Sequence, residues 1–270
     1  MAGSFLDTTI VIHVADNVEP QKSNGEVFIG ANQPTTAPYY ALRELLAGHV
    51  RILCDAHNIL NATDNPAEAT IAILNRSPAE GRKREAKARS LNKAVDAVYA
   101  AKPMMPLKDS KREVLQELAL QANNIWRKSQ KLRGVSLVQP LACFNKGKIS
   151  HGPTGELRGP KDSFNCIKDE RCAAAAYLYD NQSDLKKMID ALHPAKLEPK
   201  IAAKGETRQR RRALKELLSN GPINFHKSQC RALGDAYFAG MCPPGSVIAT
   251  SNLEDFLPLC SALNKKMIVP

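Results

Sequence analysis

Short apolar runs occur at both ends of the 270-residue chain, and neither end has enough of them to fold alone. Residues 2–7 form one run, which ends at Asp7, and Ser246–Thr250 and Lys266–Val269 form two more near the C-terminus. Short apolar runs bounded by turn residues are typical of buried strands. Because a two-layer core needs several strands with helices to cover them, we expect both ends to contribute to one α/β sheet.

The N-terminal segment is expected to supply further elements of that sheet. Glu26–Gly30 and Val50–Cys54 have the composition of strands. Between them, Pro38 precedes a helical pattern of apolar residues, and Gly48 follows it as a helix-ending signal.

The middle of the chain is predicted to be mostly helical. Asn65 and Ser110 each stand three residues before a glutamate, a common start of a helix. Gly and Pro recur through residues 139–168, which predicts a long loop. We therefore expect residues 1–60 and 206–270 to form one α/β domain, a parallel sheet of about five strands flanked by helices, interrupted by a mostly helical, basic insertion over residues 61–205.

Four acidic residues stand on or beside the terminal elements. Asp7 ends the first strand, Glu44 lies at the edge of the first helix's apolar face, Asp235 lies in a helix over Ser228–Met241, and Asp255 follows the strand Ser246–Thr250. Carboxylates that share one crevice repel each other, which raises their pKa values unless a cation neutralises them. Because Mg²⁺ and Mn²⁺ prefer oxygen ligands, the pattern predicts a site for one of these ions. Plainer interpretations are a helix cap for Asp7 or Asp255 and a solvated helix position for Glu44.

Four short motifs surround these acids in a fixed order. They are Leu6-Asp7-Thr8-Thr9, the segment ALRELLAG at residues 41–48, GDAYFA at residues 234–239, and TSNLEDF at residues 250–256. In this order they resemble the motifs of the PIN-domain nucleases. The resemblance covers the two terminal segments and implies a PIN-like parallel sheet flanked by helices.

The resemblance also implies a site and an activity. Asp7, Glu44, Asp235 and Asp255 would be both the metal ligands and the catalytic residues, with Thr8, Thr250 and Asn252 in support. Thr8 and Thr250 either hydrogen-bond the acids or satisfy local backbone groups. The implied activity is metal-dependent hydrolysis of phosphodiester bonds by an endoribonuclease of the toxin or RNA-processing type. A neutralising or complex-forming protein partner is implied by the same resemblance.

A net charge of +11 favours nucleic acid as a partner. The basic residues crowd two predicted helices, and clusters of this kind bind phosphates regardless of sequence. The candidate RNA contacts are Arg82, Lys83, Arg84, Lys87 and Arg89 on one helix, and Arg208, Arg210, Arg211 and Arg212 on the other. The alternative for each cluster is a solvated helix face. The alternative function is that of a catalytically inactive PIN-like scaffold that binds RNA or a protein through these helices. Such a scaffold needs none of the four acids, so their presence favours the nuclease.

Other classes of protein fit less well. No apolar run approaches the roughly 18 residues of a membrane span, and Asp7 stands where a signal peptide would be apolar. We therefore expect a cytoplasmic protein with reduced cysteines and no membrane partner. The spacing of Cys143, His151, Cys166 and Cys172 fits no common zinc module. No glycine loop of the GxGxxG or GxxxxGK[ST] type is present, which disfavours a nucleotide-binding α/β protein.

Overall fold

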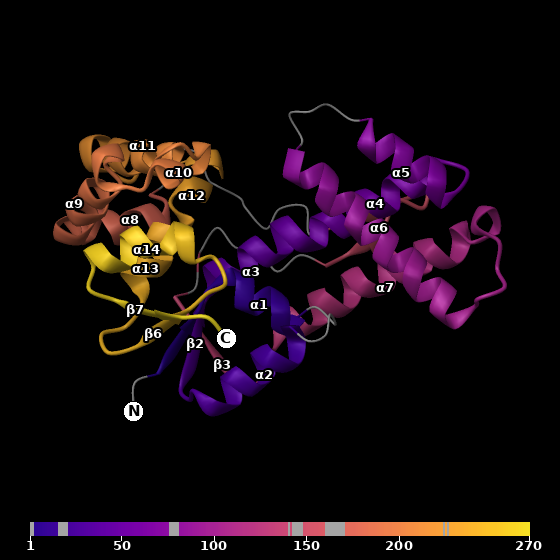
Figure 1. The fold of residues 1–270 in the computed structure, drawn as a ribbon, viewed down its shortest axis with the longest axis horizontal. Helices are drawn as coiled ribbons and strands as arrows, with labels where there is room; N and C mark the ends of the chain where they lie inside the picture. Colours follow the sequence, from indigo (N-terminus) through magenta and orange to yellow (C-terminus); the bar gives the residue numbers. More distant parts are fainter. Residues whose placement is uncertain are drawn as a thin grey trace. The chain divides into compact units, whose positions relative to one another are not determined.

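The computed structural model divides the chain into two compact units (Figure 1). Unit 1 comprises Met1–Arg43, Leu132–Asn145 and Phe164–Pro270, and unit 2 comprises Glu44–Lys131 and Lys146–Ser163. The structure describes residues 3–15, 21–75, 81–139, 141, 148–159, 171–223, 225 and 227–270, without the side chains of 81–83, 227 and 228.

The unit boundaries differ from the predicted domain boundaries. Residues 44–60 join the helical unit, whereas residues 132–145 and 164–205 join the α/β unit. Helices and a strand from within the predicted insertion thus pack with the terminal segments. Of the predicted loop at 139–168, only residues 139, 141 and 148–159 fall within the described residues.

Unit 1 is built on a sheet of five strands, all parallel, in the order β3-β2-β1-β6-β7. A parallel sheet flanked by helices was the predicted fold class. The strands are β1 (Ser4–Leu6), β2 (Thr35–Pro38), β3 (Val135–Val138), β6 (Val247–Ala249) and β7 (Lys266–Ile268).

The central strand β1 lies between β2 and β6. Ser4 is in register with Thr35 on one side and with Val247 on the other. The chain runs outward from β1 to β3 and returns to the other side of β1 as β6, so the direction of the strand order reverses there. As predicted, the strand that ends before Asp7 shares a sheet with the C-terminal strands. In open α/β sheets, the carboxyl end of such a reversal point is the usual place of a ligand site.

Two of the predicted strands are helical. Glu26–Gly30 lies within α2 (Gln21–Ala31), and Val50–Cys54 joins a π-helical turn, Leu45–Val50, to α4 (Arg51–Asn61). In α2, Val27 is 72% exposed while the two residues after it are buried. Burial on one side only is a helical pattern, which a five-residue apolar run does not reveal. The predicted helix therefore continues past Gly48, and the sheet takes β2 and β3 instead.

Helices cover the sheet of unit 1. Figure 1 shows the later ones, in orange to yellow, gathered beside β6 and β7. The helices of unit 1 are α1 (Thr8–Ala15), α2, α8 (Ala173–Asp180), α9 (Gln182–Ala191), α10 (Pro199–Ala202), α11 (Gly205–Asn220), α12 (Lys227–Ala232), α13 (Gly234–Met241) and α14 (Leu253–Ala262), and α3 (Tyr39–Glu44) ends at the unit boundary.

An aromatic cluster joins the sheet to these helices. Phe238 of α13 is fully buried, with its ring centroid 6.4 Å from that of Phe5 on β1 and 6.3 Å from that of Phe256 on α14. Tyr40 of α3 stacks edge-on against Phe238 at 5.7 Å. Such edge-to-face pairs add to the free energy of burial. The cluster fixes the starts of α13 and α14 near the carboxyl end of β1.

Unit 2 is helical, with α4, α5 (Pro66–Leu74), α6 (Gly81–Ala101) and α7 (Lys111–Gln130) around a core that includes Leu60, Leu91 and Leu118. Asn65 caps α5 as predicted, since its side chain accepts a hydrogen bond from the Glu68 nitrogen at 3.0 Å. Ser110 precedes α7, but its hydroxyl bonds the Leu107 carbonyl instead of the helix start.

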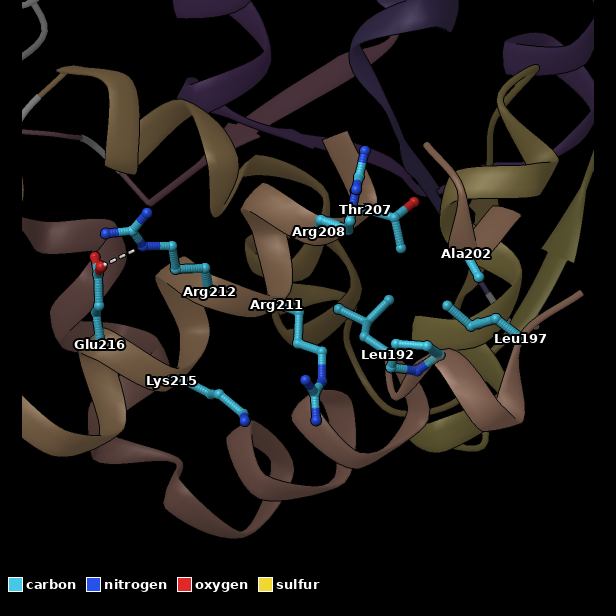
Figure 2. Close-up of a pocket in the computed structure, with 10 residues that line it drawn as sticks. Leu192, Leu197, Ala202, Thr207, Arg208, Arg211, Arg212, Lys215 and Glu216 are labelled. Atoms are coloured by element: carbon cyan, nitrogen blue, oxygen red, sulfur yellow. Dashed lines mark hydrogen bonds and ion pairs between the residues drawn. The ribbon is translucent and has the colours of Figure 1, made fainter. Parts of the chain in front are cut away.

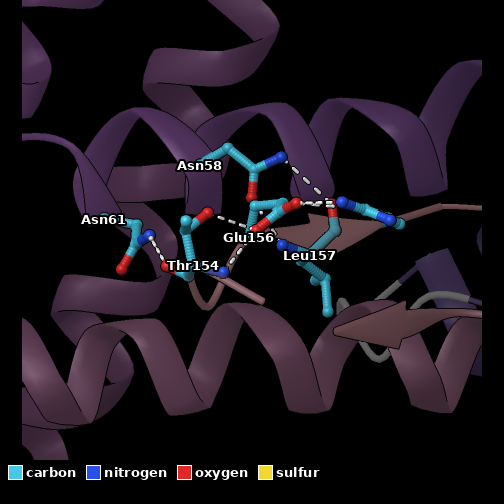
Figure 3. Close-up of polar contacts among 6 residues, drawn as sticks. Asn58, Asn61, Thr154, Glu156 and Leu157 are labelled. Atoms are coloured by element: carbon cyan, nitrogen blue, oxygen red, sulfur yellow. Dashed lines mark hydrogen bonds and ion pairs between the residues drawn. The ribbon is translucent and has the colours of Figure 1, made fainter. Parts of the chain in front are cut away.

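A short hairpin, β4 (Ser150–His151) with β5 (Leu157–Arg158), is pinned to α4 by polar contacts (Figure 3). The Asn58 side chain accepts from the Leu157 nitrogen at 2.6 Å and donates to the Leu157 carbonyl at 3.0 Å. Asn61 donates to the Thr154 carbonyl at 3.1 Å in a more exposed position.

Replacing Asn58 with alanine is expected to destabilise unit 2 by about 2 kcal/mol, because two backbone groups of the buried Leu157 lose their partner. Urea unfolding followed through Trp126, the single tryptophan and a residue of α7, measures the change. Asn61→Ala is the matched control and should cost less than half as much. Equal losses in the two variants would show that Asn58 has no special part in holding the hairpin.

Candidate functional site

Asp7 lies directly after β1, at the carboxyl edge of the sheet. Its Oδ2 accepts hydrogen bonds from the Thr250 hydroxyl at 2.8 Å and the Thr9 hydroxyl at 2.9 Å. Its Oδ1 accepts from the Thr8 nitrogen at 2.6 Å. The carboxylate therefore caps α1 and joins β1 to the turn after β6, so the cap interpretation describes part of its environment and not all of it.

Asp235 and Asp255 approach the same edge from two helices. Asp235 is in the first turn of α13, and Asp255 is in the first turn of α14. Their neighbours Phe238 and Phe256 belong to the aromatic cluster, which fixes both helix starts. The side chains of Asp235 and Asp255 are 21% and 18% exposed, whereas Asp7 is 3% exposed. The site thus has a buried carboxylate at its floor and two that reach solvent.

The three aspartates influence one another electrostatically. Burial first and the Asp235 carboxylate second raise the pKa of Asp7 to about 6, against the opposing hydrogen bonds of the threonines. Burial also raises the pKa of Asp235, and the Asp255 carboxylate adds to the effect, whereas the Arg210 guanidinium lowers it. The structure therefore brings Asp7, Asp235 and Asp255 together, although they are far apart in the sequence.

Two cations neutralise part of this charge. Arg210 of α11 forms an ion pair with Oδ2 of Asp235, and its other terminal nitrogen donates to the Asp255 carbonyl at 3.4 Å. Lys204 Nζ lies 3.6 Å from Oδ1 of Asp255 and 2.6 Å from Oε2 of Glu254. Lys204 was not among the predicted residues. Nothing in its sequence context distinguishes it from the many other lysines.

Arg210 was predicted as an RNA contact, but it is 5% exposed and faces the acidic site. The buried face of α11 carries Leu214 and Leu217, which are four and seven residues beyond Arg210. This helical spacing puts Arg210 on the inner face, a signal that was present in the sequence.

Glu44 is the last residue of α3 and the first residue of unit 2. Of the four predicted acids, the three that are grouped within unit 1 are therefore Asp7, Asp235 and Asp255. A role for Glu44 as a fourth ligand stays a prediction.

The supporting residues are accounted for in part. Thr250 is fully buried, and its hydroxyl both donates to Asp7 and accepts from the Asn252 nitrogen at 3.0 Å. The Asn252 side chain donates to Oδ2 of Asp255 at 2.9 Å. Thr8 contributes its main-chain nitrogen to Asp7, while the hydroxyl bond comes from Thr9, which was not among the predicted residues.

The donor set suits a hard divalent cation. Oδ1 of Asp255 is buried and accepts no hydrogen bond from any residue that the structure describes. As the side chains stand, however, no three Asp, Glu, His or Cys residues in the described part of the chain are grouped closely enough to hold a metal ion. In unit 1, the Arg210 guanidinium pairs with Oδ2 of Asp235, an oxygen that a cation would need.

The outer face of α11 carries the remaining predicted cations of this helix. Arg208 and Arg212 are exposed and Arg211 is half-buried. They border a pocket of about 350 Å³ with an apolar side, shown in Figure 2. The pocket is lined by Leu192, Pro194, Leu197, Ala202, Thr207, Arg208, Arg211, Arg212, Lys215 and Glu216. A cationic helix face beside apolar side chains suits an anion that carries an apolar body.

The other basic helix, α6, is less open than predicted. Lys87 is 5% exposed and pairs with Asp55 at 3.5 Å, which holds α6 against α4. Arg84 is half-buried and donates to the Leu74 carbonyl at 3.2 Å, whereas Arg89 is exposed. Arg82 and Lys83 lie in α6, but their side chains are outside the described residues. Among the predicted RNA contacts of α6 whose side chains the structure describes, Arg89 is therefore the exposed one.

Five cysteines of the described part, Cys54, Cys172, Cys230, Cys242 and Cys260, are free thiols. Cys143 and Cys166 of the unfavoured zinc alternative lie outside the described residues. Among the helices that the structure describes, none combines the length and apolarity needed to cross a bilayer.

Comparison of the chain with protein-family models, with curated proteins and with solved structures found no match. The function is therefore inferred from the geometry of the site.

Proposed function

We propose that unit 1 is a PIN-like, metal-dependent nuclease domain that hydrolyses phosphodiester bonds, and that it acts as an endoribonuclease. The observation that supports this most is the grouping of Asp7, Asp235 and Asp255 at the carboxyl edge of a parallel sheet, at the point where the strand order reverses. Acids placed elsewhere on such a fold would be ordinary surface residues.

The three aspartates would hold Mg²⁺ or Mn²⁺, with Glu44 as a proposed fourth ligand. A bound ion of this kind supplies an activated water and stabilises charge on the phosphate oxygens. Thr250 and Thr9 orient the Asp7 carboxylate through their hydroxyls. Asn252 orients Asp255 in the same way. These hydrogen bonds fix the orientation of the two carboxylates, as the hydrogen-bond partners of metal ligands do.

RNA is the proposed substrate because of the charge of the chain and of α11. The net charge of +11 attracts polyanions, and the exposed face of α11 presents Arg208, Arg211 and Arg212. The opposite face of the same helix reaches the acidic site through Arg210. By resemblance alone, we extend the proposal to a toxin or RNA-processing role with a neutralising or complex-forming protein partner.

Cleavage of a labelled RNA panel tests the proposal directly. We expect cleavage with Mg²⁺ or Mn²⁺ and none in EDTA. Single-stranded DNA of the same sequences tests whether the preference is for RNA. Absence of cleavage of every nucleic acid under all metal conditions would reject the enzyme.

Binding of RNA in EDTA is expected to weaken steeply with salt. Combined replacement of Arg208, Arg211 and Arg212 by alanine should reduce the slope of log affinity against log salt by roughly 0.7 for each phosphate that the protein no longer neutralises. A matched control removes three exposed cations of unit 2, namely Lys108, Arg112 and Lys131, and should change the slope less. Equal slopes in the two triple variants would assign the α11 arginines to a solvated face.

The second candidate is a PIN-like scaffold that binds RNA or a protein without catalysis. The Arg210–Asp235 pair favours it, since an acidic site closed by its own arginine needs no metal. Metal titration separates the two candidates, because a scaffold of this kind would bind RNA and would not bind Mg²⁺ or Mn²⁺.

A further inference from the structure

Arg210 is the residue of the acidic site that neither the nuclease proposal nor a surface role explains. Its side chain is almost fully buried. Arginine is rarely buried to this extent unless it has a charged partner. It pairs with Asp235 and reaches the Asp255 carbonyl. Its Nε is also buried and has no hydrogen-bond partner among the described residues. The guanidinium is thus incompletely satisfied where it lies.

Burying an incompletely bonded guanidinium costs free energy that some other interaction must offset. The offset available here is the charge of the acidic cluster. The Asp235 carboxylate repels that of Asp7 on one side and that of Asp255 on the other, and burial disfavours the ionised forms of Asp7 and Asp235. A cation beside Asp235 relieves part of this repulsion. The position that Arg210 occupies is therefore set by electrostatics.

The same position conflicts with a divalent ion. Oδ2 of Asp235 already accepts a hydrogen bond from the Arg210 guanidinium. A carboxylate oxygen that pairs with one cation is a poorer ligand for another. Ala213, Leu214 and Leu217 are buried and hold α11 in the core. Only the side chain needs to move for Asp235 to become available.

We propose that Arg210 is the resident counter-ion of the acidic cluster. It neutralises and orients Asp235 in the metal-free protein, and it leaves this carboxylate when a divalent ion binds. Arg210 is a positioning residue in this scheme, and its contact with Asp235 sets the affinity of the site for the ion. The inference rests on the proposed metal site.

Calorimetric titration of the full chain with Mn²⁺ tests the proposal. Arg210→Gln should bind Mn²⁺ roughly tenfold more tightly than the wild type, because the ion no longer displaces a guanidinium. The same variant should melt at a lower temperature in EDTA and gain more from Mn²⁺ than the wild type does. A merely structural role predicts the opposite, since a loosened site binds the ion less well.

Two further variants make the result decisive. Arg210→Lys keeps the charge but loses the fork that reaches the Asp255 carbonyl, so its Mn²⁺ affinity should lie between the other two. This variant carries the test if Arg210→Gln does not fold. Lys215→Ala removes one exposed positive charge from the same helix and controls for net charge, and its affinity should stay within about twofold of the wild type.

The outcomes separate this inference from the proposed function. Mn²⁺ affinity that is equal or weaker in both Arg210 variants overturns the counter-ion role and leaves the metal site standing. Absence of Mn²⁺ binding in the wild type and in the variants overturns the metal site, and the counter-ion role with it.

Discussion

Replacing Asp7 with asparagine is expected to abolish RNA cleavage while it stabilises the metal-free protein. Asp7 is the buried carboxylate at the floor of the site, and an amide cannot replace the charge that a carboxylate would supply in the proposed metal site. Asn has nearly the same shape and keeps one oxygen for the hydrogen bonds from Thr250 and Thr9. Loss of activity would therefore reflect the lost charge and not a lost fold.

The stability effect of this substitution depends on pH. In the folded protein, burial first and the Asp235 carboxylate second raise the pKa of Asp7 from 3.8 to about 6. The unfolded chain releases this proton near pH 4, whereas the folded protein holds it to about pH 6. The free energy of unfolding of the metal-free wild type should therefore fall between about pH 4 and 6, by on the order of 3 kcal/mol from this group.

Asp7→Asn removes that fall. At pH 7 in EDTA we expect a net gain of about 1–2 kcal/mol, since lost hydrogen bonds to the carboxylate offset part of the relief. Thermal melts from pH 4 to 8 measure the effect, with Asp184→Asn as the control because Asp184 forms an exposed ion pair with Lys187. A wild type and an Asp7→Asn variant with the same pH dependence would contradict the proposed environment of Asp7. Full cleavage by the variant would reject the site.

Phe238→Ala is expected to lower the free energy of unfolding by about 3–5 kcal/mol, more than any other substitution proposed for this protein. Phe238 is fully buried and contacts the rings of Phe5, Tyr40 and Phe256. Removing its ring leaves a cavity between the sheet, α3 and α14 within unit 1. Because Asp235 lies one turn before Phe238 and Asp255 is adjacent to Phe256, the arrangement of the acids should loosen as well.

Urea unfolding followed by circular dichroism measures this loss. The matched control is Leu257→Ala on α14, where the side chain is 50% exposed, and its cost should stay within about 0.5 kcal/mol. Phe238→Leu keeps most of the apolar volume and should fall between the two. A Phe238→Ala variant as stable as the Leu257→Ala control would show that the aromatic cluster does not hold the sheet to its helices.

The parts of the fold that could be predicted from the sequence are those with a local signal. β6 is wholly apolar and β1 and β7 are apolar after their first residue, and the Asn65 cap and the α11 pattern are strong helix signals. β2, which reads Thr-Thr-Ala-Pro, has little apolar character, and its place between β1 and β3 comes from pairing with strands distant in the sequence. No local pattern identifies such a strand, because its stability comes from its neighbours.

The candidate site also has parts that the sequence predicted and parts that it did not. Asp7, Asp235 and Asp255 were predicted from their positions beside apolar elements, and the structure groups all three. Arg210 and Lys204 were not predicted to pair with them, although the spacing of Arg210 on α11 indicated its burial. An ion pair between residues 25 positions apart depends on how two helices pack. Helical periodicity predicts which face of a helix is buried. It does not predict which side chains of other elements will contact that face.

The sequence by itself determined the α/β class, the joining of both ends in one parallel sheet and the acids that stand at its edge. These follow from hydrophobic periodicity and from the size of core that each segment can form. The tertiary structure decided the strand order, the division of the chain into two units, and the pairing of Arg210 with Asp235. The physical reason is that these features depend on contacts between segments far apart in the chain, whose free energies no local pattern contains.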